Sequence, residues 1–259
     1  MAQLDRPTAT IHYEVWGDAG DWVTLVNGHT RPLNDFRMLG RHLAGQGHLV
    51  LALDNRGAGS TETTGPFTLA DMTADVTALW DALGVTQSHL LGVSMGGFIA
   101  LSLALAQPAS VRRLVLVSTA MSQELIHRDD SHWEADPARV EAKLAPYFTE
   151  DFRRRNSVLV KSMVKQIAKA VAEGGFAERS EQQRRAIAGF DVASRLSELQ
   201  APTLVIHGTE DRIIPVAAAR ALEAAIPDAR LALLPGAGHL LLAERPKELY
   251  ALVGDWFRG

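Results

Sequence analysis

The sequence predicts an α/β protein with a mostly parallel central sheet, flanking helices and a helical cap inserted between strands. Three observations lead to this prediction. Short apolar runs recur without the alternation of a half-exposed strand, as in strands buried on both faces. Stretches with helical periodicity separate these runs. The alternation breaks once, between about residues 121 and 199, where the pattern is mostly helical.

The first strand predictions are Ala9–Trp16, which alternates loosely, and Trp22–Val26, which is almost continuously apolar. The later runs resemble the second one, and they are Leu49–Leu53, Leu90–Val93, Leu114–Val117, Leu204–Ile206 and Leu231–Leu234. Runs of this kind are typical of buried parallel strands.

The helix predictions rest on period. Asp35–Ala44 and Leu69–Leu83 each place apolar side chains on one face. Met95–Ala106 is apolar nearly all round and ends before a proline, so a central buried helix is expected there. Val216–Ile226 and Pro246–Trp256 complete the set.

These elements divide the chain into a core, residues 1–120 and 200–259, and a helical cap, residues 121–199. The cap is expected to cover the C-terminal edge of the sheet, where α/β proteins bind their ligands. A chain of 259 residues with 47% apolar residues is long enough to bury such a core without disulfides or structural metals.

Composition excludes several classes. Without cysteine the chain has no disulfide, no thiolate nucleophile and no cysteine-ligated metal site. A net charge of −4 does not favour a nucleic-acid or membrane partner. The N-terminus lacks the features of a secretory signal, so a cytoplasmic location is expected. Oligomeric state is left open.

The strongest chemical signal is Gly92-Val93-Ser94-Met95-Gly96. It lies between an apolar strand and the buried helix, which is the context that the G-x-S-x-G pattern requires. A serine on such a sharp turn needs small residues two positions before and after it. The turn presents the hydroxyl at a helix N-terminus, where backbone N–H groups and the helix dipole favour negative charge. Ser94 is the predicted nucleophile.

A serine hydroxyl needs a base, and the base needs a carboxylate to orient it. His239 follows the last apolar run in a glycine-rich loop, and Asp211 follows the preceding run. The chain order Ser94, Asp211, His239 is the order this architecture uses. Asp191 is a weaker rival for the acid, because it precedes the strand.

The remaining histidines are expected at the surface or out of contact with substrate. His127 and His132 flank Asp129-Asp130, but their spacing matches no metal-binding pattern. A solvated cap surface is expected there, and no metal site is predicted.

Together these motifs resemble those of the α/β-hydrolase fold superfamily, in its cap-bearing branch of carboxylesterases and 3-oxoadipate enol-lactonases. A further motif, Asp54-Asn55-Arg56-Gly57-Ala58-Gly59-Ser60, is similar to the D-x-R-G-x-G-x-S loop of that family. In the family this loop is chiefly structural, and the resemblance implies the same role for Asp54 and Arg56.

The resemblance also implies an oxyanion hole made by the backbone N–H groups of Met95 and His29. Gly28 aligns with the family glycine that precedes the second donor. The chain departs from the family at Asn27, where a histidine is usual. The donor is backbone, so this departure affects only how the loop is braced.

The expected activity is hydrolysis of small carboxylic esters through an acyl-enzyme, without metal, nucleotide or flavin. Two alternatives stay open. One is an enol-lactonase or carbon–carbon bond hydrolase of aromatic catabolism, which uses the same three side chains. The other is a ligand receptor in signalling that keeps the triad.

The substrate pocket is expected to take bulky side chains from the cap, although ordinary packing between cap helices explains any one of them more simply. The candidates are Trp133, Tyr147, Phe148, Phe152 and Met163. A substrate that bears a carboxylate would need a basic residue in the pocket, and Arg31, beside the predicted oxyanion loop, is the first candidate. Lys161, Lys165 and Lys169 recur every four residues, which predicts one solvated helix face.

Overall fold

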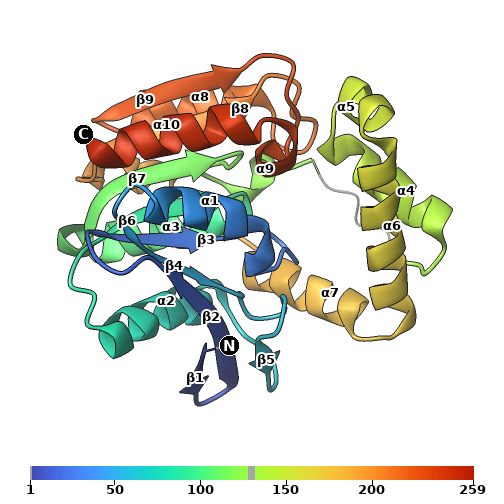
Figure 1. Ribbon diagram of the computed structural model, residues 1–259, viewed down its shortest axis with the longest axis horizontal. Helices are drawn as coiled ribbons and strands as arrows, with labels where there is room; N and C mark the ends of the chain where they lie inside the picture. The colour runs from blue at the N-terminus through green and yellow to red at the C-terminus, as the bar shows by residue number, and fades with distance from the viewer. Residues whose placement is uncertain (1, 128–131) are drawn as a thin grey trace.

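A computed structural model of the chain describes residues 2–127 and 132–259 (Figure 1). Their strands form one nine-stranded sheet in the order β1-β2-β4-β3-β6-β7-β8-β9, with β5 paired to β2. The strands are β1 Ala2–Arg6, β2 Ala9–Trp16, β3 Trp22–Val26, β4 Leu49–Leu53, β5 Glu62–Thr63, β6 Ser88–Val93, β7 Val111–Val117, β8 Thr203–Gly208 and β9 Ala229–Leu234.

The strands β4, β3, β6, β7, β8 and β9 pair parallel in that order. At one edge of the sheet, β2 pairs antiparallel with β1, β4 and β5. The central strands β6 and β8 are buried along their whole length. Their continuous apolar runs are therefore the consequence of cover on both faces.

The helices cover the two faces of the sheet (Figure 1). They are α1 Arg37–Ala44, α2 Leu69–Leu83, α3 Met95–Ala106, α8 Val216–Ala225, α9 Leu241–Glu244 and α10 Pro246–Arg258. Buried side chains of α2, α3 and α8 form one apolar cluster with the sheet. Those of α1 and α10 form a second cluster on the opposite face.

The predicted helices over 69–83 and 95–106 match α2 and α3 to the residue. Thr68 and Asp71 form a capping box that begins α2, and Gly84 at φ 69° ends it. The predicted helix over 35–44 begins instead with a 3-10 turn, Leu33–Phe36, before α1.

Three short elements were not predicted. The exposed β1 and the two-residue β5 lie at the edge of the sheet, where few side chains are buried and no apolar run is needed. The four-residue α9 is too short to show a period.

Between β7 and β8 the described residues form four α helices, which lie to one side of the sheet (Figure 1). They are α4 Pro137–Leu144, α5 Glu150–Arg155, α6 Ser157–Ala172 and α7 Phe176–Ala186. We call residues 121–199 the helical insertion. It has an apolar cluster of its own, built from α4, α5, α6 and Phe148. Of the described helices, none combines the length and the apolarity that a membrane crossing needs.

Candidate active site

Ser94 lies on the turn between β6 and α3, in a conformation that non-glycine residues rarely adopt, with φ 52° and ψ −119°. The flanking glycines make this turn possible by close approach. A Cβ atom on Gly92 would lie 2.4 Å from the carbonyl oxygen of Gly96. A Cβ atom on Gly96 would lie 2.1 Å from the carbonyl oxygen of Val26 in β3. The second glycine is therefore required by the neighbouring strand.

The structure brings Ser94, His239 and Asp211 together. Nε2 of His239 lies 3.1 Å from Oγ of Ser94, and Nδ1 lies 2.8 Å from Oδ2 of Asp211. Because the carboxylate only accepts, Nδ1 carries the proton and Nε2 is left to accept from the serine hydroxyl. These three residues follow β6, β9 and β8, whose C-terminal ends meet at one edge of the parallel sheet.

The carboxylate of Asp211 is buried, and both of its oxygens accept hydrogen bonds. Its Oδ1 accepts the backbone N–H groups of Ile213 and Ile214 at 2.8 and 2.9 Å. Burial favours the neutral form, but attraction to His239 and its hydrogen bond, with help from His207, keep the pKa of Asp211 below its usual value. Asp211 is therefore ionised at neutral pH and able to hold the imidazole of His239. Asp191, the rival acid, is exposed and accepts the N–H of Ala193.

His207, at the end of β8, is a further partner of the carboxylate, and its side chain is wholly buried. Burial lowers its pKa, so the ring is neutral at pH 7. Nε2 lies 2.8 Å from the carbonyl oxygen of Ile214 and 3.3 Å from Oδ2 of Asp211. Since both neighbours are acceptors, Nε2 carries the proton and donates toward them.

Of the two places expected for the other histidines, four of them take the one away from the surface. His12, His48, His89 and His207 are all buried. His12, His89 and His207 lie in strands, and His48 directly precedes β4. The pattern of apolar runs carries no signal for a buried imidazole. His12 contacts Asp54, with Nδ1 2.7 Å from Oδ2.

The loop after β3 passes beside the serine. A Cβ atom on Gly28 would lie 3.2 Å from Cβ and 3.8 Å from Oγ of Ser94. Asn27 braces this loop from within: its Oδ1 accepts the N–H of Gly28 at 2.8 Å, and its Nδ2 donates to the carbonyl of Pro32 at 2.8 Å. Asn55 adds a hydrogen bond to the carbonyl of Asn27. The asparagine thus supplies bracing at the position where the family usually has histidine.

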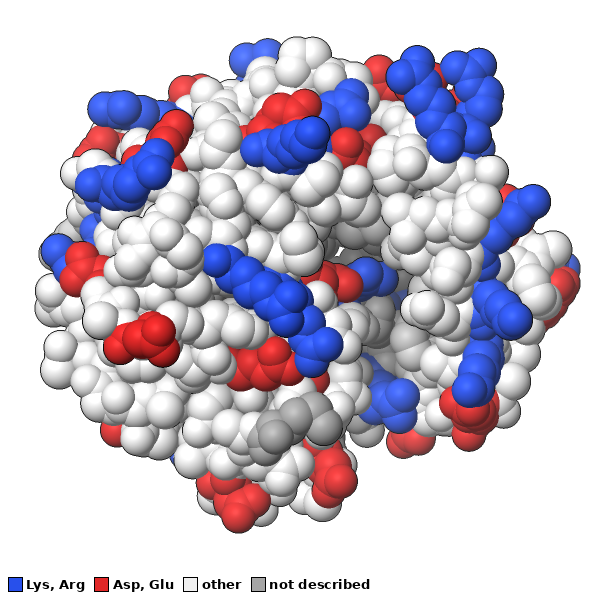
Figure 2. All heavy atoms as spheres, viewed as in Figure 1, with Lys and Arg blue, Asp and Glu red and all other residues white. Residues whose placement is uncertain are grey.

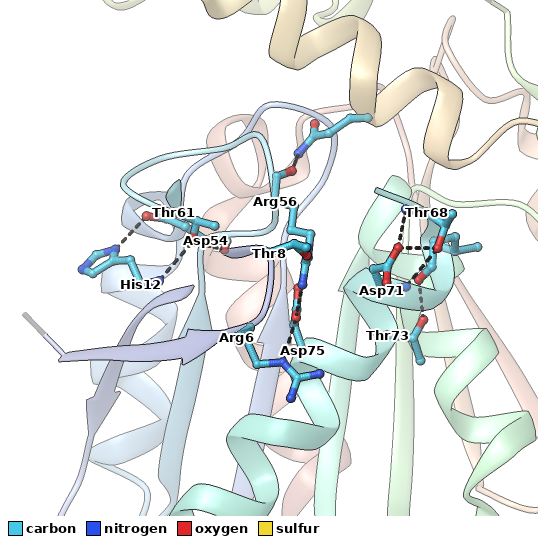
Figure 3. A network of polar contacts seen from close by, with 12 residues as sticks. Arg6, Thr8, His12, Asp54, Arg56, Thr61, Thr68, Asp71, Thr73 and Asp75 are labelled. Atoms are coloured by element: carbon cyan, nitrogen blue, oxygen red, sulfur yellow. Dashed lines mark hydrogen bonds and ion pairs between the residues drawn. The ribbon is translucent and has the colours of Figure 1, made fainter. Parts of the chain in front are cut away.

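The motif loop from Asp54 to Ser60 is held by buried polar contacts (Figure 3). Asp54 accepts the N–H groups of Leu33 and Ser60 at 2.6 and 2.8 Å. The guanidinium of Arg56 makes two hydrogen bonds with Asp75, at 2.7 and 2.9 Å. None of these contacts involves Ser94, and they agree with a bracing role for Asp54 and Arg56.

A cavity of about 660 Å³ lies between the sheet edge and the helical insertion. Ser94, Met95, His29 and His239 line it on the side of the core. Apolar side chains of the insertion line much of the other side, among them Ile126, Leu144, Leu159, Met163, Ile167 and Ile187. Lys143, Glu181 and Arg184 add charged groups there. Figure 2 shows a hollow on this face of the molecule, with basic and acidic side chains around it. This volume is in the range of small-molecule sites.

The predicted pocket residues divide into two groups. Trp133, Tyr147 and Met163 line the cavity, and the Tyr147 ring packs edge-on against His239 at 5.5 Å. Phe148 and Phe152 do not line it, because they stack on each other inside the apolar cluster of the insertion. They fill the space between helices, the simpler explanation that the sequence also allowed.

Arg31 lines the cavity, but its guanidinium makes two hydrogen bonds with Asp35, at 2.7 and 2.8 Å. Its charge is therefore already matched by a carboxylate. Lys161 and Lys165 are exposed on α6, as the four-residue spacing predicted, and Lys169 pairs with Glu173 across one turn.

Glu244 in α9 was not identified from the sequence, yet it ties the histidine loop to the insertion. It accepts the N–H of Gly238 at 3.1 Å and the N–H of Thr149 at 2.9 Å. The N–H of His239 itself donates to the carbonyl of Tyr147 at 3.1 Å. His239 is thus held by a backbone contact from the insertion as well as by Asp211.

Within residues 2–127 and 132–259, no group of three or more histidine and carboxylate side chains is arranged to hold a metal ion. Of the predicted solvated cluster, Asp129 and Asp130 lie outside the described residues, while His127 and His132 are exposed and border the cavity.

Comparison with known proteins agrees with this fold. The profile of the alpha/beta hydrolase fold family matches residues 21–246. A 2-hydroxymuconate semialdehyde hydrolase of Pseudomonas putida is 31% identical over 224 residues, with 84% of this chain and 79% of that protein covered. The 3-oxoadipate enol-lactonase 1 of Acinetobacter baylyi is 29% identical, with 81% and 78% covered. The solved enol-lactonase of Burkholderia xenovorans LB400 superposes with a TM-score of 0.84 over 97% of both chains at 27% identity.

Proposed function

The chain belongs to the alpha/beta hydrolase fold family, and from that premise we propose that it is a serine hydrolase that cleaves carboxylic esters of small molecules. The observation that supports this most is the continuous contact from Oγ of Ser94 through the imidazole of His239 to the carboxylate of Asp211. We assign these side chains the roles of nucleophile, base and orienting acid.

The proposed reaction has two halves. Nε2 of His239 takes the proton of Ser94 as Oγ attacks the acyl carbonyl, and the proton then passes to the leaving alcohol. A water molecule, activated by the same imidazole, attacks the acyl-enzyme and releases the acid. Asp211, ionised and fixed by two backbone N–H groups, stabilises the imidazolium that forms in each half.

In both halves negative charge develops on the acyl oxygen. We propose that the backbone N–H groups of Met95 and His29 stabilise it. Met95 is the first residue of α3, so its N–H points out of the helix N-terminus, and His29 follows Gly28, which lies beside Ser94. Each such donor is worth about 3 kcal/mol of transition-state stabilisation.

The cavity supports a small, largely apolar acyl or alcohol group. Much of its lining from the insertion is apolar. Arg31, which also lines it, already pairs with the carboxylate of Asp35. An uncharged ester fits this lining without leaving a buried charge unpaired. Trp133, Tyr147 and Met163 are the proposed contacts.

A second candidate, an enol-lactonase or carbon–carbon bond hydrolase, is supported by the two curated relatives near 30% identity. A hydrolysis screen separates the candidates: p-nitrophenyl esters, lactones and a vinylogous 1,5-diketone are tested with wild type and Ser94→Ala. The proposal predicts the highest kcat/KM on an ester and none in the variant. A higher kcat/KM on the lactone or the diketone would favour the second candidate. Single turnover with a ligand-dependent rise in Tm would favour a receptor.

A further inference from the structure

A fully buried glutamine of the insertion links the loop beside Ser94 to the motif loop that contains Arg56. Gln183 lies on α7 and has no exposed surface. Its Oε1 accepts the N–H of Thr30 at 2.6 Å, and its Nε2 donates to the carbonyl of Arg56 at 2.6 Å. One partner is a donor and the other an acceptor, so the amide has a single orientation that satisfies both. Because the side chain is buried and bonded at both ends, it fixes the distance between the Thr30 N–H and the Arg56 carbonyl.

The Thr30 contact lies next to the proposed oxyanion donor. The N–H that Gln183 binds belongs to the peptide group that joins His29 to Thr30, so the hydrogen bond sets the plane of that peptide. Thr30 itself has φ 58°, in the left-handed region that β-branched residues rarely enter. Conformations of this kind persist where surrounding contacts determine them. Gln183 is such a contact.

The same helix holds the His29 side chain. Nε2 of His29 lies 2.8 Å from the carbonyl oxygen of Ser180, one turn before Gln183 on α7. Because a carbonyl only accepts, this ring nitrogen carries the proton. His29 is thus bound to α7 through its side chain, and Thr30 through its backbone N–H.

The other end of the glutamine is anchored to a rigid point. Arg56 is 3% exposed, and its guanidinium is fixed by the paired hydrogen bonds to Asp75 and by a bond to Thr8 at 2.7 Å (Figure 3). Movement of Gln183 relative to the core would break a bond at this anchor. Gln183 therefore holds Thr30 at a fixed distance from the backbone of Arg56 in the core.

We propose that Gln183 is a positioning residue for the oxyanion loop: it holds the His29–Thr30 peptide so that the His29 N–H faces the developing charge. This inference rests on the proposed function. Removing a donor from an oxyanion hole lowers kcat by about 10²–10³-fold. Loss of Gln183 leaves the donor present but less well placed, so a decrease of about 10–100-fold is expected.

The test uses a fluorophosphonate probe, because its reaction needs the same groups but no knowledge of the substrate. Oγ of Ser94 forms the bond to phosphorus, its proton passes to His239, and fluoride leaves. The phosphoryl oxygen occupies the place of the acyl oxyanion. Labelling rates are measured for wild type, Gln183→Leu and the matched control Gln182→Leu, which changes the half-buried neighbour on the same helix.

The proposal predicts that Gln183→Leu labels about 10–100-fold more slowly but reaches the same final stoichiometry. With a p-nitrophenyl ester, kcat falls by a similar factor while KM changes less than twofold. Equal final labelling separates a misplaced donor from a misfolded fraction. Gln182→Leu is expected to behave as wild type.

If Gln183→Leu does not fold, Gln183→Asn replaces it, since the shorter amide cannot reach both partners at once. Labelling of the folded Gln183 variant at the rate of Gln182→Leu would overturn the positioning role and leave the proposed function intact. Wild type that does not label at all would instead overturn the proposed function, and the inference with it.

Discussion

Replacing Asp211 by asparagine changes one oxygen to an amide, and the structure determines which one. Oδ1 accepts two backbone N–H groups, from Ile213 and Ile214, so the amide oxygen must stay there to avoid facing two donors. The NH₂ group then takes the place of Oδ2, 2.8 Å from Nδ1 of His239. It donates to Nδ1, and the ring proton moves to Nε2.

A proton on Nε2 faces the hydroxyl of Ser94 at 3.1 Å, so the imidazole no longer accepts the serine proton. The same exchange of tautomer in another triad enzyme lowers kcat by ~10⁴-fold, which is about 5 kcal/mol of barrier. Asp211→Asn should therefore lose about four orders of magnitude in kcat on a p-nitrophenyl ester. Its Tm should fall by a few degrees only: the Oδ1 contacts persist, but the NH₂ group now faces the Nε2–H of His207.

Two measurements check this reasoning. Nitrogen-15 NMR of the His239 ring reports its tautomer, which should change from Nδ1–H to Nε2–H in the variant. Asp191→Asn is the matched control and should keep full activity, since that side chain is exposed and only accepts the N–H of Ala193. An Asp211→Asn enzyme with more than a tenth of wild-type kcat, or a large loss in Asp191→Asn, would refute the assignment of the acid.

Three further predictions test other parts of the structure. Gly96→Val should prevent formation of the serine turn, because a Cβ atom there would meet the Val26 carbonyl oxygen at 2.1 Å; soluble variant protein with wild-type Tm and activity would contradict this. Burial, with the charge of His48, lowers the pKa of His89 to about 4. The unfolded chain therefore binds this proton first as pH falls, and wild type should lose up to about 3 kcal/mol more stability than His89→Gln between pH 7 and pH 4; equal denaturant midpoints across that range would count against it. Glu244→Gln places an amide donor against the backbone N–H of Gly238 or Thr149, which costs about 2 kcal/mol of folding free energy. The Tm of this variant should therefore fall by about 5 °C. The control Glu248→Gln, at an exposed position, should leave the Tm unchanged.

Most of the core could be predicted from the sequence because burial on both faces leaves a direct pattern. The apolar runs that form β3, β4 and β6 and the all-apolar α3 are consequences of their central place in the sheet. The edge strands β1 and β5 have no such constraint, so their sequences carry no comparable signal.

The site divides in the same way. Ser94, Asp211 and His239 could be proposed because each follows a recognisable apolar run, and parallel strands bring their C-terminal ends to one edge. Gln183 and Glu244 could not, because Gln183 bonds to the backbone of Arg56, and Glu244 to that of Thr149, far away in the sequence. An isolated glutamine or glutamate on a helix has the same local pattern whether it is solvated or buried.

The most direct test of the central claim is rapid-quench mass spectrometry with a p-nitrophenyl ester. At times shorter than one turnover, the account predicts an acyl group on the peptide that contains Ser94, and none in Ser94→Ala. An acyl group on another residue, or ester hydrolysis by the Ser94→Ala protein at the wild-type rate, would contradict it.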